Sequence, residues 1–190
     1  MKIEEAERAI KDLLPEKRYR HSLGVSETAV KLAEKYGADV EKARLAGMLH
    51  DIAKYFSDEE LKAVILRRSD ISDDFLNYSD KLWHAPVGAA YVQEHMGIDD
   101  REILDAMTYH TTGRNEMSLL EKIIFLADYI EPGRDFPGVD VVRETAAVSL
   151  DDAVLQELQK TIIHLLEKRQ SVYPKTFEAY NDFVKKNSMR

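Results

Sequence analysis

The sequence contains no cysteine among its 190 residues. This absence excludes disulfides, zinc ribbons, iron–sulfur clusters and catalytic thiols, because each of them needs cysteine sulfur. Any metal ion that the protein binds must then be held by nitrogen and oxygen atoms.

An excess of positive charge is also absent, since 27 Lys and Arg residues stand against 35 Asp and Glu residues and give a net charge of -8. A chain with this balance has no overall basic field to attract nucleic acid, so we expect no nucleic-acid partner. A small anionic substrate is compatible with this charge, provided that one pocket is locally positive.

Long apolar runs are missing as well. No stretch approaches the roughly 20 apolar residues that cross a bilayer. The charged first residues, MKIEE, do not resemble a secretory signal. We therefore expect a cytoplasmic protein with no membrane partner.

Strand-like alternation is scarce, whereas apolar residues recur at spacings of three and four almost throughout, which predicts an all-α fold. No linker, repeat or low-complexity segment divides the chain, so we expect one domain over residues 1–190. Gly, Pro and capping residues place the expected helices at about 16–36, 39–53, from 57, 85–97, 99–110, 118–130, 140–147, 151–172 and after Pro174, with a loop and short turns at 69–81.

Two ionisable residues, His50 and Asp51, stand side by side in a segment that is otherwise mostly apolar. A buried carboxylate without a partner is strongly penalised, so Asp51 is expected to have a cation, a hydrogen-bond donor or a metal ion beside it. If the doublet stood alone, a surface-facing pair would be the better interpretation.

Further histidines and an aspartate share the apolar faces of other predicted helices. His21 is four residues before Val25, and the others are His84, His110 and Asp128. Taken singly, each is more typical of a satisfied core histidine or a capping carboxylate. Together, on inward faces of different helices, they predict a site for one or two divalent ions such as iron, manganese or zinc.

The pattern of a histidine, a distant His-Asp doublet and a distant aspartate resembles the HD superfamily of metal-dependent phosphohydrolases, which are helical bundles. Five short segments are similar to the bacterial YqeK family, namely RYRHSLGV at 18–25, LHDIAK at 49–54, HAPVGA at 84–89, YHTTG at 109–113 and ADYIEPGR at 127–134. These segments lie within residues 18–134. The predicted helices of 139–190 agree in length with the family but contain no proposed site residue.

The resemblance implies an enzyme that hydrolyses diadenosine tetraphosphate symmetrically to two ADP, usually with iron. It implies that His21, His50, Asp51 and Asp128 are the metal ligands. Asp51, His84 and His110 are the implied catalytic residues. His84 and His110 would contact phosphate or bind a second metal ion.

A water bound to such a metal has a lowered pKa and supplies the attacking hydroxide, while the metal offsets charge on the phosphoryl oxygens. Because the chain is acidic, we expect further cations at the pocket, and Arg18, Lys54 and Arg134 lie beside the proposed ligands in sequence. For each of these three, ordinary solvated surface charge is an equal alternative. Tyr129 is a candidate for stacking on a base, although aromatic residues are more often part of a core.

Two other functions stay open at this point. The same metal site would serve a nucleotidase or a phosphodiesterase that acts on other nucleotides. A non-catalytic regulator that binds nucleotide and metal without turnover is the second alternative. Metal identity and number, base preference and assembly as a homodimer are left undecided by the residues alone.

Overall fold

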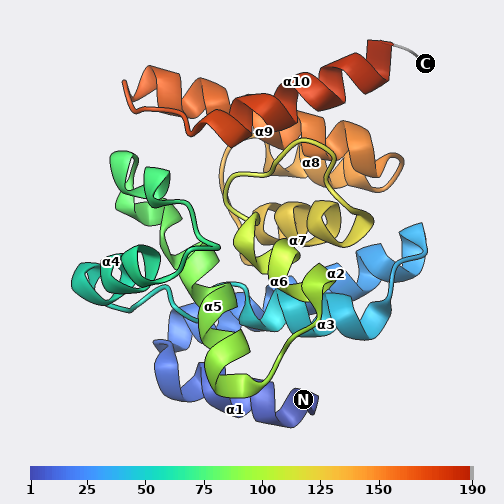
Figure 1. Cartoon of the computed structure of the whole chain (residues 1–190). Helices are drawn as coiled ribbons and strands as arrows, with labels where there is room; N and C mark the ends of the chain where they lie inside the picture. Colours follow the sequence, from blue (N-terminus) through green and yellow to red (C-terminus); the bar gives the residue numbers. More distant parts are fainter. Residues whose placement is uncertain (189–190) are drawn as a thin grey trace.

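The computed structural model describes residues 1–188 and contains ten α-helices, two short 3-10 helices and no strand within that range (Figure 1). The all-α prediction is therefore confirmed. The elements are α1 (Ile3–Leu13), α2 (Glu16–Tyr36), α3 (Val40–Leu49), α4 (Asp58–Arg67), η1 (Asp73–Asn77), η2 (Asp80–Leu82), α5 (His84–Met96), α6 (Arg101–Thr108), α7 (Leu119–Ile130), α8 (Val139–Ala146), α9 (Leu150–Glu167) and α10 (Pro174–Ser188).

Capping residues set most helix ends where the sequence predicts them. Gly37 ends α2 in the left-handed conformation with φ of 77°, which a residue without Cβ adopts without steric cost. Asp39 accepts hydrogen bonds from the first free N–H groups of α3. Ser57 and Ser118 each form a capping box with the glutamate three residues later, at the starts of α4 and α7.

The helix predicted over 39–53 is shorter than expected, because α3 ends at Leu49. The following backbone bonds span three residues, from Ile52 N–H to Leu49 C=O at 3.0 Å and from Lys54 N–H to Asp51 C=O at 2.9 Å. The chain therefore turns more tightly than an α-helix, and His50 and Asp51 lie in this turn.

Other boundaries also differ from the sequence prediction. Helix α6 ends at Thr108, two residues before the predicted end, and α9 ends at Glu167 instead of continuing to Val172. Helix α1 was not among the predicted elements. It adds Ala6 and Ile10 to the core.

Helices α2 and α3 approach each other closely near the polar cluster. A Cβ atom on Gly47 would lie 3.0 Å from the Ser26 Cα atom, so this crossing requires glycine. The Ser26 hydroxyl donates to the Arg44 carbonyl at 2.8 Å and ties the two helices together. This tight packing fixes the turn at His50 against the first half of α2.

One apolar core runs from Ala6 in α1 to Phe183 in α10, and a smaller cluster that includes Phe75 and Tyr173 lies under the 3-10 helices. In Figure 1, α9 and α10 cross over α7 and α8, while α2 and α3 lie on the opposite side of α7. The single domain expected over 1–190 stays a prediction, and its last two residues lie outside the described part. No helix within residues 1–188 is both long enough and apolar enough to cross a membrane.

Candidate metal centre

The four residues proposed as metal ligands come together at the end of α3. His21 projects from α2 and Asp128 from α7, and the His21 Nε2 atom lies 3.0 Å from Asp128 Oδ1. His50 Nε2 lies 3.3 Å from Asp51 Oδ2 and 3.8 Å from Asp128 Oδ1. Two helices and one turn thus supply the set, instead of three helices as the sequence suggested.

The His21 and His50 rings are each oriented by a hydrogen bond at Nδ1, which directs the Nε2 atom toward the two carboxylates. The His50 Nδ1 atom lies 2.7 Å from the Gly47 carbonyl, which only accepts, so Nδ1 carries the proton of a neutral ring. The His21 Nδ1 atom donates in the same way to Glu131 Oε1 at 3.0 Å. The Nε2 atoms of both rings are buried without a hydrogen-bond partner among the described residues.

A lone pair on each of these Nε2 atoms faces negatively charged oxygen. Such an arrangement is repulsive unless a cation lies among the ligand atoms, and it is the arrangement that metal-binding histidines adopt. The donor set of imidazole nitrogens and carboxylate oxygens therefore fits a divalent ion.

Glu131 is a site residue that the sequence reasoning missed. It is 4% exposed, and besides holding His21 its Oε2 atom accepts the Gly133 N–H at 2.5 Å. A Cβ atom on Gly24 would lie 2.7 Å from the same oxygen, so a glycine is needed where α2 passes this carboxylate. A usable signal was present, because Glu131 follows Asp128 by three residues and precedes a Pro-Gly turn.

His84 and His110 meet the opposite oxygen of Asp51. The His84 Nε2 atom lies 2.9 Å from Asp51 Oδ1 and 3.2 Å from His110 Nε2. The His110 Nδ1 atom donates to the Met107 carbonyl at 2.6 Å, which directs its Nε2 toward the cluster. Burial lowers the pKa of His84 to about 4, so the ring is neutral at neutral pH and offers a lone pair.

Three overlapping groups of residues have the spacing of metal ligands, with ligand atoms within 4.8 Å of one another. Four of the six residues in these groups are buried, and the other two, His21 and Asp128, are partly buried. The groups are His21–His50–Asp51, His50–His110–Asp128 and Asp51–His84–His110. The overlap accommodates one ion or two, as the sequence allowed.

The two carboxylates are held in the charged form despite their surroundings. Burial alone would raise the pKa of Asp51, but the neighbouring His50, His110 and His84 rings outweigh it and keep that pKa well below its usual value. For Asp128, burial is likewise outweighed, first by the neighbouring His21 ring and then by His50 and Arg134, and its pKa is lowered.

The same carboxylates act on His50. Burial disfavours its charged form, yet Asp51 and then Asp128 raise its pKa. Two buried negative charges need positive charge beside them. A bound divalent ion would supply that charge in place of a ring proton.

All three cations predicted at the site lie against it. The Arg18 Nη1 atom lies 2.8 Å from Asp51 Oδ2, and Arg134 contacts both the side chain and the carbonyl of Asp128. Lys54 Nζ lies 3.3 Å from His84 Nδ1, and burial lowers its pKa. The structure thus brings these side chains together with the proposed ligands, and their role toward substrate stays a prediction.

Tyr129 packs against Phe136, an aromatic residue that the sequence analysis did not select and that lines the cavity beside the cluster. The rings of Tyr129 and Phe136 meet edge to face with centroids 4.9 Å apart. Phe136, together with Arg18, His21 and Arg134, lines a cavity of about 620 Å³ that opens beside the cluster. Burial raises the pKa of Tyr129 to about 12, so its hydroxyl stays protonated.

The C-terminal helices, to which the sequence assigned no chemistry, also reach the site. Glu157 on α9 is 5% exposed, and its Oε2 atom has no hydrogen-bond partner among the described residues. Burial first, and then the charge of Asp128, raise the pKa of Glu157 well above its usual value. It therefore adds little negative charge behind Asp128.

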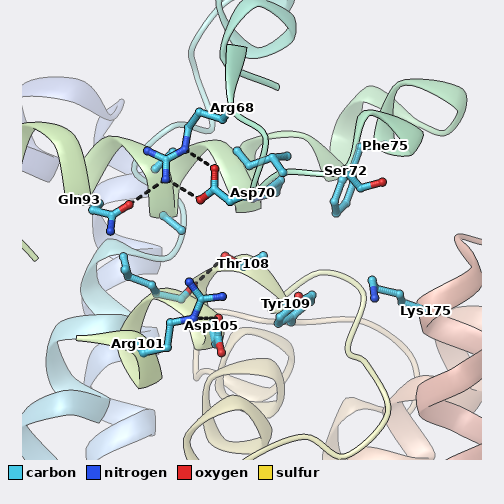
Figure 2. Close-up of a pocket in the computed structure, with 15 residues that line it drawn as sticks. Arg68, Asp70, Ser72, Phe75, Gln93, Arg101, Asp105, Thr108, Tyr109 and Lys175 are labelled. Carbon is cyan, nitrogen blue, oxygen red and sulfur yellow. Dashed lines mark hydrogen bonds and ion pairs between the residues drawn. The ribbon is translucent and has the colours of Figure 1, made fainter. Parts of the chain in front are cut away.

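A separate cavity of about 270 Å³ lies between α5 and α6 and is lined by none of the proposed metal ligands. Figure 2 shows Arg68 beside Asp70 on one wall and Arg101 beside Asp105 on the other. Arg68 donates to both oxygens of Asp70, at 2.9 and 2.6 Å, and Arg101 lies 3.2 Å from Asp105. Its arginines are therefore already paired with carboxylates.

Comparison with known proteins agrees with this geometry. The family model of the HD domain matches residues 18–133. The symmetrical bis(5'-nucleosyl)-tetraphosphatase of Bacillus subtilis is 49% identical over 97% of this chain and 98% of its own length, and that of Staphylococcus aureus is 48% identical over 95% and 94%.

A solved structure is similar as well. The crystal structure of a predicted HD superfamily hydrolase involved in NAD metabolism, from Clostridium acetobutylicum, superposes with a TM-score of 0.93 at 40% identity, covering 98% of each chain. The family match and the His/Asp cluster together indicate a site for a divalent metal. The chain therefore belongs to the HD domain family and, within it, to the YqeK family that its five sequence words resemble.

Proposed function

We propose that the protein is a metal-dependent hydrolase that cleaves diadenosine tetraphosphate, and related dinucleoside polyphosphates, symmetrically into two nucleoside diphosphates. The observation that carries this proposal is the buried cluster in which the Nε2 atoms of His21 and His50 lack partners beside two charged carboxylates. Relatives that share about half of the residues over almost the whole chain are named for this symmetrical activity.

His21, His50, Asp51 and Asp128 would hold the metal ion, with His84 and His110 as further ligands if a second ion binds. Iron is the metal that we propose, with manganese and zinc as alternatives that the same nitrogen and oxygen donors accept. When bound, a divalent ion activates a water molecule and offsets negative charge on phosphoryl oxygens.

The chain itself binds and orients the polyphosphate. Arg18 and Arg134 are each anchored on a ligand carboxylate, through Asp51 and Asp128, so their guanidinium groups are fixed at the mouth of the site. Arginine is suited to this task because its planar donors match phosphate oxygens. The two cations concentrate positive charge locally in a chain with a net charge of -8.

Lys54, His84 and His110 lie on the other side of the Asp51 carboxylate. Lys54 contacts the His84 ring, and His84 contacts His110 at 3.2 Å. A neutral His84 accepts or donates a hydrogen bond toward a phosphate oxygen, depending on its tautomer. We propose that this group stabilises the charge that develops as the central phosphoanhydride bond breaks.

Product analysis on metal-loaded protein tests the proposal. The protein is loaded with ferrous iron, manganese or zinc, its metal content is measured, and its reaction with diadenosine tetraphosphate is separated by chromatography. ADP as the sole product is expected. AMP together with ATP would contradict symmetrical cleavage, hydrolysis of mononucleotides alone would favour a nucleotidase, and nucleotide binding without any product would favour a regulator.

The cytoplasmic location and the lack of nucleic-acid and membrane partners that the sequence predicts stay predictions, and assembly as a homodimer, which the sequence left undecided, is open. Size measurement in solution with and without nucleotide tests the homodimer.

A further inference from the structure

Two cavities are each lined by a histidine that approaches the Asp51 carboxylate, and the two histidines face different oxygens of it. The large cavity, of about 620 Å³, reaches His21, whose Nε2 atom lies 3.7 Å from Asp51 Oδ2. The small cavity, of about 150 Å³, reaches His84, whose Nε2 atom lies 2.9 Å from Asp51 Oδ1. A molecule that reached both histidines would pass the Asp51 carboxylate, which lies between them.

The segment 54–56 separates these cavities. Tyr55 lines the large cavity, whereas Lys54 and Phe56, its two neighbours in sequence, line the small one. Tyr55 is 56% exposed, so its ring stands at the rim and is not part of the core.

The charges of the two cavities differ. The small cavity has two lysines, Lys54 and Lys81, against Asp58 and Asp80. The large cavity has two carboxylates, Glu131 and Asp135, and Glu131 is already engaged by His21 and Gly133. Against them stand the four cations Lys17, Arg18, Arg20 and Arg134, of which Arg20 pairs with Glu16, and Arg18 and Arg134 pair with the proposed ligands Asp51 and Asp128. The large cavity is therefore the positive one, which suits a diphosphate.

Their volumes also differ in a way that decides what each can enclose. Cavities that enclose small molecules measure roughly 300–1,000 Å³, so the large one has room for a whole nucleoside diphosphate and the small one does not. Phosphate groups, by contrast, need only a few donors at a surface.

An aromatic ring is available in the large cavity for the base. Phe136 is partly buried, and its edge-to-face contact with Tyr129, with centroids 4.9 Å apart, keeps the ring in place. Nucleobases stack on such rings regardless of their hydrogen-bonding edges.

From these observations we propose that the two halves of the substrate are held unequally. One nucleoside diphosphate is enclosed in the large cavity, with its base on Phe136 and its phosphates at Arg18 and Arg134. The other half places only its phosphates in the small cavity, at Lys54 and Lys81, and leaves its nucleoside outside on the surface. This inference rests on the proposed function, which it extends to base recognition.

The test compares diadenosine tetraphosphate with adenosine tetraphosphate, which lacks the second nucleoside. Water breaks the same central P–O–P bridge in both, giving two ADP from the first and ADP plus pyrophosphate from the second. If the second nucleoside lies outside, kcat/KM for the two substrates should agree within about threefold. A loss of about thirtyfold or more with adenosine tetraphosphate would mean that both nucleosides are enclosed and would overturn the proposal.

Substitutions separate the two cavities. Phe136→Ala should weaken ADP binding to the manganese-loaded protein about tenfold, which is typical for loss of one stacked base. Phe136→Leu, which keeps an apolar side chain, should show the same loss, and Phe177→Ala, at an exposed aromatic residue on α10, should show none. Unchanged ADP binding in both Phe136 variants would overturn the assignment.

Lys81→Ala should lower kcat/KM for both tetraphosphates about tenfold and leave ADP binding within twofold of wild type, with the exposed Lys31→Ala as its control. Equal losses of ADP binding and turnover in Lys81→Ala would contradict the assignment of the small cavity. ADP binding can be measured without turnover, so the two proposals can fail separately. If neither tetraphosphate is cleaved, the proposed function is wrong. If ADP binding in that case still depends on Phe136 and not on Lys81, the unequal use of the two cavities is supported.

Discussion

Two regions of this molecule both place arginines beside aspartates, and they differ in whether every polar atom there has a hydrogen-bond or ion-pair partner. In the cavity of Figure 2, Arg68 and Asp70 form a two-bond ion pair and Arg101 faces Asp105. At the metal centre, the Nε2 atoms of His21 and His50 have no hydrogen-bond partner among the described residues. Unused lone pairs beside charged carboxylates, and not the mere presence of charged residues, distinguish the region that requires a ligand.

Burial sharpens this difference. Asp51 is 2% exposed, whereas Asp70 is an exposed residue at the rim of the other cavity. Exposed ion pairs typically contribute about 0–1 kcal/mol, because water competes for both partners. A buried carboxylate depends on its partners far more, since it has lost its hydration. Equivalent substitutions in the two regions should therefore have very different effects.

The largest difference is expected between Asp51→Ala and Asp70→Ala. Asp51→Ala removes a proposed ligand and the hydrogen-bond partner of Arg18 and His84, so turnover should fall below detection and bound metal should decrease. Asp70→Ala should change kcat/KM by less than about twofold and stability by about 1 kcal/mol or less. Metal analysis and kinetics on both variants check this, and full activity in Asp51→Ala would remove that residue from the ligand set.

The next largest effect is expected for His110, which we propose acts in catalysis and is not needed to retain a single metal ion. His110→Ala should lower kcat roughly 100-fold or more, the scale of a positioned proton donor or acceptor. One metal ion should still be retained, because His21, His50, Asp51 and Asp128 are intact. Equal loss of that ion in His110→Ala and Asp51→Ala would show that the division between ligands and pocket residues is wrong.

Glu131→Gln tests how strongly the orientation of His21 depends on its buried partner. One carboxylate oxygen accepts from the His21 ring and the other accepts from the Gly133 N–H. In glutamine an NH2 group, which only donates, replaces one of these two oxygens, so one of the two bonds is lost. Metal affinity should fall roughly 10- to 100-fold, as is usual when the partner of a ligating histidine is removed. The measurement is an equilibrium metal titration.

Glu121→Gln is the matched control for that substitution. Glu121 is also a buried glutamate on or beside α7, but it pairs with Arg114 and caps the helix start, away from the cluster. Its loss should lower the melting temperature without changing metal affinity. If the two variants lose the same metal affinity, Glu131 acts through stability and not through His21.

The fold and the six central residues were accessible from the sequence for a physical reason. His21 and Asp128 fall on apolar helical faces where an ionisable residue is costly, so periodicity marks them as candidates, and the resemblance to the HD superfamily assigns them as ligands. The caps at Gly37, Ser57 and Ser118 are likewise local, since each acts within one turn of its helix.

What the sequence could not give depends on contacts between distant segments. Glu131 supports His21 across 110 residues, and Glu157 lies behind Asp128 although it belongs to α9. The turn at His50 was also missed, because its apolar neighbours continue the helical period past Leu49 while the backbone tightens. For Glu157 and the turn at His50, no local pattern distinguishes these positions from ordinary helix residues, whereas the spacing of Glu131 from Asp128 was a signal that could have been used.

The smallest effect is expected for Lys54→Ala, which separates a phosphate-binding cation from ordinary surface charge. Lys54 is partly buried, and its Nζ atom lies 3.3 Å from the His84 ring, so we group it with the metal centre. Within the described chain it forms no salt bridge with a proposed ligand carboxylate. A hydrogen bond to a charged group contributes about 1.5–3 kcal/mol, so kcat/KM should fall roughly 10- to 100-fold. Bound metal should not change, because no ligand is removed.

Lys54→Arg should recover part of the loss, since it restores the charge with a different shape. Lys62→Ala, at an exposed position on α4, should be indistinguishable from wild type. Kinetics of Lys54→Ala that match those of Lys62→Ala would return Lys54 to the solvated surface.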